Sequence, residues 1–408
     1  MQGQRIVLGV TGGIAVYKIA TLASHLTQVG AEVDVVMTEA ATHFVAPLTF
    51  QALTGRPVYT DLWQMPTAGL PTHISHVGLA HAATLLVIAP ATANTLAKMA
   101  NGLGDNLLST LFLATRCPVL AVPAMDVGMW QNPATQANVE RLRARGVHFA
   151  GPAWGRMASG LEGEGRMIEP DEIVGHVRKV MGASGRLAST HVVVTAGPTR
   201  EAIDPVRFIS NPSSGRQGFA LAQAAIDQGA RVTLVAGPTQ LPTPVGAERV
   251  NVTTAQEMLD AVLAASRDAD VLLMAAAVGD YQPASVAAQK IKKAGDLSLS
   301  LVRTPDVLSS VAARRRETNR PRLLVGFAAE SENLVANAQA KLTAKQLDLI
   351  VANDVTASGS GFAVETNQVT LIDRRSGIET LPLLSKSAVA DAIIERVIAL
   401  LAADDLTG

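Results

Sequence analysis

The sequence has little of several residue types that would mark it as a particular class of protein. Of 408 residues only Cys117 is a cysteine, so no disulfide can form within the chain and a reducing compartment is expected. Aromatic residues make up 3% and charged residues 17%, whereas hydrophobic residues make up 48%. With 34 basic and 35 acidic residues the net charge is -1, which excludes a general attraction to nucleic acid or anionic lipid. Any phosphate-binding site must therefore be local.

Long apolar segments are also missing. The longest weakly charged run, about residues 80–97, contains Pro90 and several threonines, and it predicts a buried strand followed by a loop rather than a membrane span. The apolar run near the N-terminus is interrupted by Gly12 and Gly13 and closed by Lys18, so we expect no signal sequence. These patterns predict a cytoplasmic protein with neither a membrane nor a nucleic-acid partner.

The length and an internal resemblance predict two domains. A chain of 408 residues exceeds what one hydrophobic core usually holds, so two domains of about 200 residues are expected. Both halves open alike, with an apolar strand, a glycine turn, an alanine-rich helix, and a Gly-Ala pair that leads into a second strand. These two βαβ openings begin at residues 6–13 and 192–198.

The boundary between the halves is marked by composition. The segment 182–185 is small and polar, and it follows a helical pattern near residues 173–181. We therefore place the first domain over residues 1–181, a linker over 182–190 and the second domain over 191–408.

The remaining apolar runs predict the fold class. They are continuous, without the alternation of a strand that faces water on one side, which is typical of parallel strands buried on both faces. These runs are Leu85–Ala89, Val119–Val122, Val271–Ala277, Leu323–Phe327 and Leu349–Ala352. The pattern predicts an α/β protein of two doubly wound, three-layer domains. Residues 369–372 and 380–384, on either side of 374–377, predict a hairpin at the edge of the second sheet.

Three loops of the first half have the composition of a ligand site. Gly12 and Gly13 lie between a strand and a helix, where bare backbone amides can hold a phosphate, although a glycine pair alone is equally typical of a tight turn without a ligand. A second loop, Pro90–Thr95, and a third, Pro123–Trp130, each leave the carboxyl end of a buried strand, where open α/β sheets place ligands.

Together these loops resemble those of the flavin-dependent cysteine decarboxylases, from about residue 6 to residue 170. That family, which has a flavodoxin-like fold, carries a PASANT loop, a PxMNxxMW loop and a histidine in an HIxL-like segment, here His76–Leu79. The resemblance implies that His76 acts on the substrate. It also implies that FMN is bound by Gly12, Gly13, Thr38, Ala91, Thr92, Ala93 and Asn94. His73 and His81 have no motif support, and we assign them a surface or packing role.

The chemistry implied by the resemblance requires the flavin. A cysteine carboxylate does not lose CO2 readily, because the resulting carbanion cannot delocalise. Oxidation of the thiol carbon by the flavin provides that delocalisation, and the reduced flavin later returns the hydride, so the net reaction is redox-neutral.

Two positions depart from the family pattern. Asp126 stands where the motif has asparagine, and facing a substrate carboxylate it would be repelled unless protonated. Ser159 stands where many members have a cysteine that donates the proton of the final reduction, and a hydroxyl is a far weaker acid than a thiol. Cys117, at the start of a buried strand, has the context of a packing residue and is not a natural substitute. We expect decarboxylation to persist with a different proton donor.

The second half contains a segment, residues 195–215, that is dense in glycine, proline, hydroxyl groups and arginine and is costly to order without a ligand. Ser213–Gly215 lead into a helix, a natural position for a phosphate, and Arg207 adds a bidentate donor. This half resembles the phosphopantothenate–cysteine ligases over nearly all of residues 191–390. The matching segments are 195–215, 275–281, 290–293, 304–307, 326–330 and 353–354.

The ligase resemblance implies a Rossmann-like domain that activates a carboxylate as an acyl-nucleotide, which the amine of cysteine then attacks. Arg207 and Asn211 would handle the activated phosphopantothenate, and Lys290 would offset developing charge. Magnesium would bridge the triphosphate, with Asp280 as its protein partner. CTP is the nucleotide commonly used in bacteria, but no residue distinguishes it from ATP. The implied nucleotide contacts are Ala275, Ala276, Asp280, Lys290, Pro305, Asp306, Phe327, Lys341 and Lys345.

The leading interpretation is a bifunctional enzyme of coenzyme A synthesis, because the product of the second half is the substrate of the first. One alternative is a ligase whose flavin domain is catalytically impaired and serves as an oligomeric scaffold, which Asp126 and Ser159 favour. Another is a flavin-binding regulatory protein. The family's trimeric flavin domains, with the flavin site at a subunit boundary, and its dimeric ligase domains together imply a homo-oligomer, and specifically a dodecamer.

Overall fold

The computed structural model describes residues 1–63, 70–72, 74–292, 296–330, 333–354, 364–375 and 377–405, the side chains of residues 329, 330 and 354 excepted. The chain divides into two compact units, residues 1–181 and 182–408, which are described separately. Among the described residues no helix is long and apolar enough to cross a membrane.

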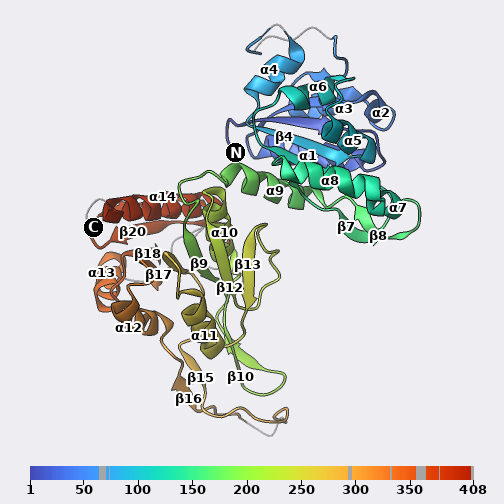
Figure 1. Ribbon diagram of the computed structural model, residues 1–408. Helices are drawn as coiled ribbons and strands as arrows, with labels where there is room; N and C mark the ends of the chain where they lie inside the picture. The colour runs from blue at the N-terminus through green and yellow to red at the C-terminus, as the bar shows by residue number, and fades with distance from the viewer. Residues whose placement is uncertain are drawn as a thin grey trace. The chain divides into compact units, whose positions relative to one another are not determined.

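Unit 1, blue to green in Figure 1, is built on a parallel sheet of six strands in the order β3-β2-β1-β4-β5-β6. The strands are β1 (Arg5–Val10), β2 (Glu32–Met37), β3 (Val58–Tyr59), β4 (Leu85–Ala91), β5 (Val119–Pro123) and β6 (His148–Phe149). Consecutive strands diverge on either side of the β1–β4 pair, so the strand order reverses there. In open α/β sheets this switch point is where ligands bind.

Helices cover both faces of this sheet. Ile6 and Leu8 of β1 pack with α1 (Val16–Gln28) and α9 (Pro170–Gly182) on one face, while Val7 packs with α5 (Ala93–Asn101) and α6 (Leu107–Ala114) on the other. The remaining helices are α2 (Glu39–Thr42), α3 (Pro47–Thr54), α4 (Ser75–Ala82), α7 (Val127–Gln131) and α8 (Pro133–Ala144). An antiparallel hairpin, β7 (Ala153–Arg156) and β8 (Glu162–Arg166), completes the unit.

Unit 2 repeats this plan with a larger sheet in the order β13-β12-β9-β14-β17-β18-β20-β21. The first six strands are parallel and the last two antiparallel. The strands are β9 (His191–Ala196), β12 (Arg231–Ala236), β13 (Ala247–Asn251), β14 (Val271–Met274), β17 (Leu323–Glu330), β18 (Leu349–Asp354), β20 (Val369–Asp373) and β21 (Ile378–Thr380). Its switch point lies between β9 and β14.

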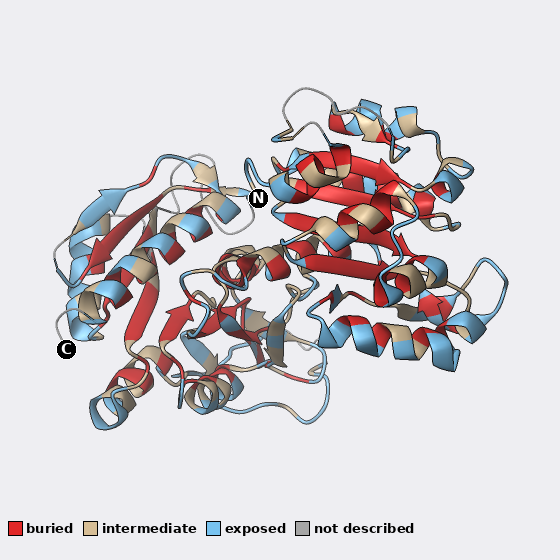
Figure 2. Cartoon of the chain, turned by 45° about the horizontal axis from the view of Figure 1, so that its top comes forward, coloured by how far each residue is buried: buried red, intermediate tan, exposed pale blue. Residues whose placement is uncertain are grey.

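Two hydrophobic clusters lie on opposite faces of this sheet, one under α10 and α14 and the other under α11, α12 and α13. These helices are α10 (Arg216–Asp227), α11 (Ala255–Ala265), α12 (Val307–Thr318), α13 (Leu334–Ala344) and α14 (Lys386–Asp405). Two-stranded pairs join β10 (Arg200–Ala202) with β11 (Phe208–Ser210), β15 (Tyr281–Pro283) with β16 (Leu301–Arg303), and β19 (Thr366–Asn367) with β22 (Leu384–Ser385). Figure 2 shows the buried strands flanked by helices that are buried only on their inner side.

The fold class predicted from the continuous apolar runs is confirmed, since both units are doubly wound and three-layered. The predicted hairpin at the sheet edge is also present, but its second strand covers residues 378–380 instead of 380–384. Pro382 follows closely and has no N–H to donate to a ladder, which accounts for the early end of this strand.

The loops predicted after β4 and β5 are shorter than expected. Pro90 and Ala91 still belong to β4, and α5 begins at Ala93, with Thr92 as its N-cap accepting a hydrogen bond from Thr95 N at 3.3 Å. Likewise α7 begins directly after Asp126, whose carboxylate accepts from Gly128 N at 3.0 Å. Capping side chains start each helix shortly after its strand ends.

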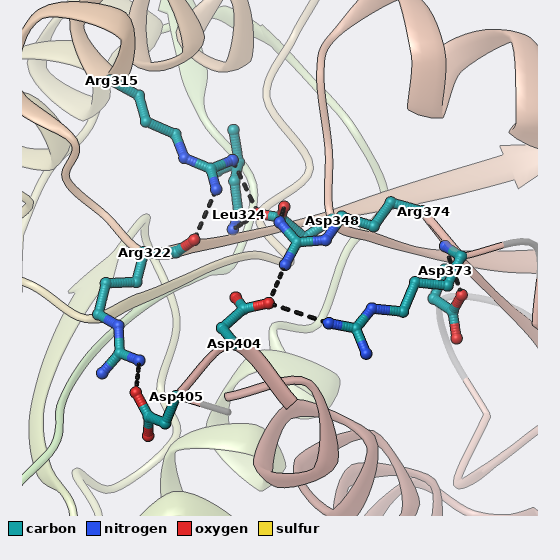
Figure 3. A network of polar contacts seen from close by, with 9 residues as sticks. Arg315, Arg322, Leu324, Asp348, Asp373, Arg374, Asp404 and Asp405 are labelled. Atoms are coloured by element: carbon teal, nitrogen blue, oxygen red, sulfur yellow. Dashed lines mark hydrogen bonds and ion pairs between the residues drawn. The ribbon is translucent and has the colours of Figure 1, made fainter. Parts of the chain in front are cut away.

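A buried carboxylate joins strands and helices at the amino ends of the parallel strands of unit 2 (Figure 3). Asp348, whose side chain is 4% exposed, accepts from the backbone N–H of Leu324 at 2.7 Å and from Arg315 at 2.7 Å, and it also pairs with Arg374. Asp404, 24% exposed, pairs with Arg374 and with Arg375. The two carboxylates share Arg374 but differ in burial, so their contributions to stability should differ.

We predict that Asp348→Asn lowers the unfolding free energy of unit 2 by about 3 kcal/mol, because buried arginine contacts and a buried N–H lose their anionic partner. The matched change Asp404→Asn should cost less than about 1 kcal/mol, because its pairs are accessible to water. Urea unfolding followed by circular dichroism measures both. Trp63, Trp130 and Trp154 all lie in unit 1, so tryptophan fluorescence reports that unit and should not shift. Equal losses in the two variants would contradict the prediction.

Candidate functional site

A cavity of about 1040 Å³ lies in unit 1 at the carboxyl ends of β1, β2, β4 and β5. It occupies the switch point of the sheet, and its volume is that of a pocket for a cofactor-sized ligand. Eight of the residues predicted for the flavin site line it: Gly12, Gly13, Thr38, Thr92, Ala93, Asn94, Asp126 and Ser159.

Threonine hydroxyls join the first two loops of this cavity. Thr11 Oγ1 donates to the carbonyl oxygen of Pro90 at 2.5 Å, and the backbone N–H of Thr92 donates to Thr11 Oγ1 at 3.2 Å. Thr92 Oγ1 in turn contacts Thr95 Oγ1 at 3.2 Å. The loop after β1 is thereby fixed against the start of α5, so the cavity wall is defined before a ligand binds.

The β7–β8 hairpin closes against the loop after β5 because two glycines of β8 allow close approach. A Cβ atom on Gly165 would lie 2.3 Å from the carbonyl oxygen of Met125, and one on Gly163 would lie 2.7 Å from the Val127 side chain. Instead the Met125 N–H donates to the carbonyl oxygen of Gly165 at 3.0 Å. This contact places the turn of the hairpin at the cavity.

The two residues that depart from the decarboxylase pattern meet at this contact. Ser159, in the hairpin turn, donates from Oγ to Asp126 Oδ2 at 2.9 Å, while the other oxygen of Asp126 accepts from Gly128 N. Each was singled out separately in the sequence, and only the fold places them in direct contact.

One observation fits a bound flavin. Thr38 Oγ1 is buried and has no hydrogen-bond partner within the described part of the chain, although it lines the cavity. A buried hydroxyl without a partner is costly, and a ligand acceptor would satisfy it. A Cβ atom on Gly12 would lie 2.4 Å from that of Ala40, so this position requires glycine. By contrast Gly13 has only Thr92 Cγ2 nearby, at 3.7 Å, and borders open space.

Two predicted residues do not line this cavity. Ala91 lies within β4 and is fully buried, with its carbonyl oxygen accepting from Ala124 N at 3.2 Å. His76 lies on α4, and its Nδ1 atom is buried without a partner among the described residues. His81, on the same helix, is exposed, and His73 lies outside the described residues. The catalytic assignment of His76 therefore stays a prediction.

Charged residues that no motif indicated also line the cavity. Lys18 pairs with Glu169 at 2.8 Å, and Lys98 pairs with Asp105 at 2.6 Å. The Lys98 ammonium holds the pKa of the Asp105 carboxyl below its usual range. These pairs join residues that are remote in sequence or belong to ordinary helical patterns, so the sequence carried no signal for them. Cys117 lies outside the cavity, half-buried, and burial raises the pKa of its thiol, which fits a packing role.

A second cavity, of about 540 Å³, lies in unit 2 where the loop after β14 and the segment 303–308 meet β17 and α13. The loops after β9 and β14 are joined there, since Thr199 N donates to Ala277 O at 3.2 Å and Gly279 N donates to Thr199 Oγ1 at 2.9 Å. Seven of the predicted nucleotide contacts line it: Ala276, Asp280, Pro305, Asp306, Phe327, Lys341 and Lys345.

The two lysines are positioned on this cavity by α13. Lys341 Nζ donates to the carbonyl oxygen of Phe327 at 3.0 Å, and Lys345 pairs with Asp306 and donates to Ser309 Oγ at 2.7 Å. Burial alone would raise the pKa of Asp306, but the Lys345 ammonium and the Ser309 N–H outweigh it and lower that pKa. The pair therefore faces the cavity as a carboxylate and an ammonium, at the N-terminus of α12.

Three predicted residues of this half lie elsewhere. Ala275 is packed against the core beneath the sheet, and Lys290 is exposed and does not line the cavity. Arg207 is held outside it by Asp204. Asn211 lies beside the cavity, because its amide nitrogen donates to the carbonyl oxygens of Ala277 and Val278 at 3.3 and 3.2 Å.

Asp204 organises the segment around Arg207, and sequence reasoning assigned it no role. Its buried carboxylate accepts from the backbone N–H groups of Val206, Arg207 and Ile291 at 2.9, 2.8 and 3.2 Å, and from Arg207 Nε at 2.9 Å. The Arg207 guanidinium and these N–H groups hold the pKa of Asp204 well below its usual range, although desolvation of the carboxylate acts in the opposite direction. The Asp-x-x-Arg spacing in the sequence could have indicated the contact between these two side chains. Arg303 and Thr304, which line the cavity, were also missed.

Known proteins similar to this chain cover almost its whole length. Residues 1–182 match the family model described as flavoprotein, and residues 187–401 match that of the DNA/pantothenate metabolism flavoprotein C-terminal domain. Coenzyme A biosynthesis bifunctional proteins CoaBC of Vibrio vulnificus strain YJ016, Bacillus subtilis strain 168 and Escherichia coli strain K12 are 48%, 45% and 43% identical to it. These alignments cover 97%, 98% and 98% of this chain and 98%, 98% and 97% of the relatives.

We predict that Asp204→Asn speeds amide hydrogen exchange at Val206 and Arg207 by at least about tenfold, because the amide is uncharged and its nitrogen cannot accept a hydrogen bond. The pKa of Asp204 is lower in the folded than in the unfolded protein. The stabilisation that the Asp204 carboxylate provides is therefore complete above its unfolded pKa of about 4, and it is lost only as the pH falls through its folded pKa. Wild-type protection factors should be unchanged between about pH 7 and pH 5.

The control for this measurement is Asp260→Asn, an exposed position on α11 whose carboxylate accepts from the Gln256 side chain. Its exchange rates at Val206 and Arg207 should match wild type. Unchanged exchange in the Asp204 variant would show that the segment is ordered by other contacts.

Proposed function

This chain belongs to the family of bifunctional coenzyme A biosynthesis proteins, and from that premise we propose how its two units perform consecutive reactions. Unit 2 ligates cysteine to 4'-phosphopantothenate with CTP, through an acyl-cytidylate. Unit 1 decarboxylates the resulting 4'-phosphopantothenoylcysteine to 4'-phosphopantetheine with FMN. The observation that carries this proposal is that each unit has its own cavity at the carboxyl edge of its sheet, lined by the residues of its own motif set.

In unit 2, the cavity supplies cations where a triphosphate would lie. Lys341 faces it from α13 and Lys345 from the C-cap of that helix, and Arg303 from β16 adds a third positive side chain. Such groups offset the charge that develops during nucleotidyl transfer. Asp280 also lines the cavity, and we propose that it contributes one ligand to Mg²⁺, the other ligands being triphosphate oxygens and water. Asn211 beside the cavity would orient the acyl group.

In unit 1, FMN would be held by the glycine turn, Thr38 and the start of α5. The flavin supplies the two-electron oxidation that makes loss of CO2 feasible and returns the hydride afterwards. The chain itself keeps the loops in place through Thr11 and Thr92, and it covers the cavity with the β7–β8 hairpin. Asp126 and Ser159 face the substrate from the loop after β5 and from the hairpin turn.

We also propose that the protein acts as a homo-oligomer, with His76 supplied to the cavity of a neighbouring copy. His76 does not line the cavity of its own chain, and Ile74, two residues before it, exposes a large apolar side chain. In unit 2 the β15–β16 pair exposes Leu301, Val302 and Tyr281. Exposed apolar groups of this kind mark protein contacts. A trimeric unit 1 combined with a dimeric unit 2 gives a dodecamer, and the mass in solution tests this.

Incubation of the whole chain with phosphopantothenate, cysteine and either CTP or ATP tests the function directly, with products identified by mass. We expect phosphopantetheine, CO2, CMP and pyrophosphate with CTP. Accumulation of phosphopantothenoylcysteine without CO2 would instead support the second candidate, a ligase with an impaired flavin domain, which the substitutions at Asp126 and Ser159 favour. Pyrophosphate release that depends on phosphopantothenate would exclude a purely regulatory protein.

We predict that Thr38→Val weakens FMN binding about tenfold, equivalent to about 1.4 kcal/mol, because the hydroxyl that would meet the cofactor is removed. The unfolding free energy of the FMN-free protein should not fall, since the hydroxyl has no partner in the described structure. Fluorescence titration with FMN and urea unfolding measure the two effects. A loss of stability without a loss of FMN affinity would place Thr38 in the packing instead.

We predict that Lys345→Gln raises the KM for CTP by about 10- to 100-fold, because a charged hydrogen bond to a phosphate is lost. The control is Arg267→Gln, which removes a positive charge from an exposed position outside the cavity and should leave KM unchanged. Decarboxylation of supplied phosphopantothenoylcysteine should be normal in both variants. An unchanged KM in the Lys345 variant would remove this residue from the nucleotide site.

A further inference from the structure

The contact between Asp126 and Ser159 joins a group that can store a proton to one that can transfer it. Ser159 Oγ lies 2.9 Å from Asp126 Oδ2, and both residues line the cavity of unit 1. Asp126 is further fixed by the Gly128 N–H on its other oxygen, so the carboxylate has a defined orientation. The glycines of β8 bring the hairpin turn to this position, as described above.

Other charged groups that line the cavity are already paired or exposed. Lys18 and Arg166 both contact Glu169, and Lys98 contacts Asp105. Glu39 and Arg156 also line the cavity, as exposed residues. Asp105 accepts from the Ser109 hydroxyl at 3.3 Å, but Ser109 does not line the cavity. Among the described lining residues, Asp126 is the carboxylate whose hydroxyl partner, Ser159, also lines the cavity and so offers a path for a proton.

The proposed decarboxylation, on which this inference rests, provides both the need for a proton and its source. Binding brings the substrate carboxylate into a cavity that already contains the Asp126 carboxylate. Two carboxylates held close together share one proton, because the doubly charged state is unfavourable. When the substrate carboxylate leaves as neutral CO2, the electron pair stays on carbon, and the shared proton remains on Asp126.

We propose that Asp126 takes up this proton when the substrate binds and delivers it, through the Ser159 hydroxyl, to the carbon that lost CO2. In the step, the Ser159 O–H bond breaks as a C–H bond forms, and the Asp126 proton moves to Ser159 Oγ. The enethiolate becomes a thioaldehyde, and Asp126 returns to a carboxylate. A bound flavin would return the hydride that it removed in the first stage to the thioaldehyde carbon, and a proton from solvent would replace the thiol proton lost in that stage. Electrons and protons balance over the cycle.

The geometry of the pair fits this direction of transfer. While Asp126 is a carboxylate it can only accept, so the Ser159 proton points to it. Once Asp126 is protonated it donates to Ser159 Oγ, and the serine proton is free to point to the substrate. A serine alone is too weak an acid for this role, whereas a protonated Asp126 replaces the proton that Ser159 gives up, so the function of Ser159 depends on Asp126.

The first test measures proton uptake on binding to the flavin-loaded full chain, without turnover. The probe is phosphopantothenoylserine, which keeps the carboxylate but has no thiol to oxidise, and its decarboxylated counterpart is the matched ligand. Calorimetry near neutral pH in buffers of different ionisation enthalpy should give uptake of about one more proton for the carboxylate ligand. This difference should vanish in Asp126→Asn. Any proton uptake that accompanies binding at unit 2 is the same in wild type and variant. An equal difference in proton uptake between the two ligands in both proteins would therefore overturn the proposal.

The second test follows a single turnover of phosphopantothenoylcysteine without oxygen, recording CO2 and the flavin absorbance. In Ser159→Ala and Asp126→Asn, CO2 should be released, but the absorbance of oxidised flavin should return about 100-fold more slowly. Ser159→Cys should restore the return, because a thiol donates without help from Asp126. Glu164→Gln, a carboxylate of β8 outside the cavity, is the control and should behave as wild type.

The outcomes separate this inference from the proposed function. If wild type releases no CO2, the decarboxylation itself is wrong. If CO2 is released and the absorbance returns at the wild-type rate in Ser159→Ala, the proton reaches the substrate by another route and the relay is overturned.

Discussion

The parallel pairing of the strands determines where this chain can have its sites. A connection between parallel strands must cross a face of the sheet, so helices bury both faces and the strands become continuously apolar. All carboxyl ends then meet at one edge, and at the switch points β1–β4 and β9–β14 the helices diverge to opposite faces. Both cavities lie at such edges, and their walls are the loops that leave the adjacent strands.

Within that arrangement, small residues determine how closely the loops approach. Gly12 lies against Ala40, and Gly163 and Gly165 bring the β7–β8 hairpin onto the loop after β5. A side chain at Gly165 would separate Ser159 from Asp126, because it would collide with the Met125 carbonyl. The polar contacts of the cavity therefore depend on glycines, which have no functional side chain themselves.

In unit 2, buried carboxylates rather than small residues hold neighbouring segments together. Asp204 is buried and collects three backbone N–H groups and Arg207, so a segment without regular structure becomes ordered. Asp348 does the same at the opposite side of the sheet, through Leu324, Arg315 and Arg374. Buried carboxylates of this kind are tolerated because every acceptor position is used.

The sequence by itself determined the class of fold and the motif loops, because continuous apolar runs, glycine turns and helix-capping residues act over a few neighbouring positions. It also identified Asp126 and Ser159 as unusual, each by comparison with a family pattern. Only the tertiary structure decided that these two residues touch, that Asp204 reaches Ile291, and that His76 and Lys290 lie outside the cavities of their own units. Such pairings join positions tens of residues apart, and they depend on how hairpins and loops pack together, which no local pattern encodes.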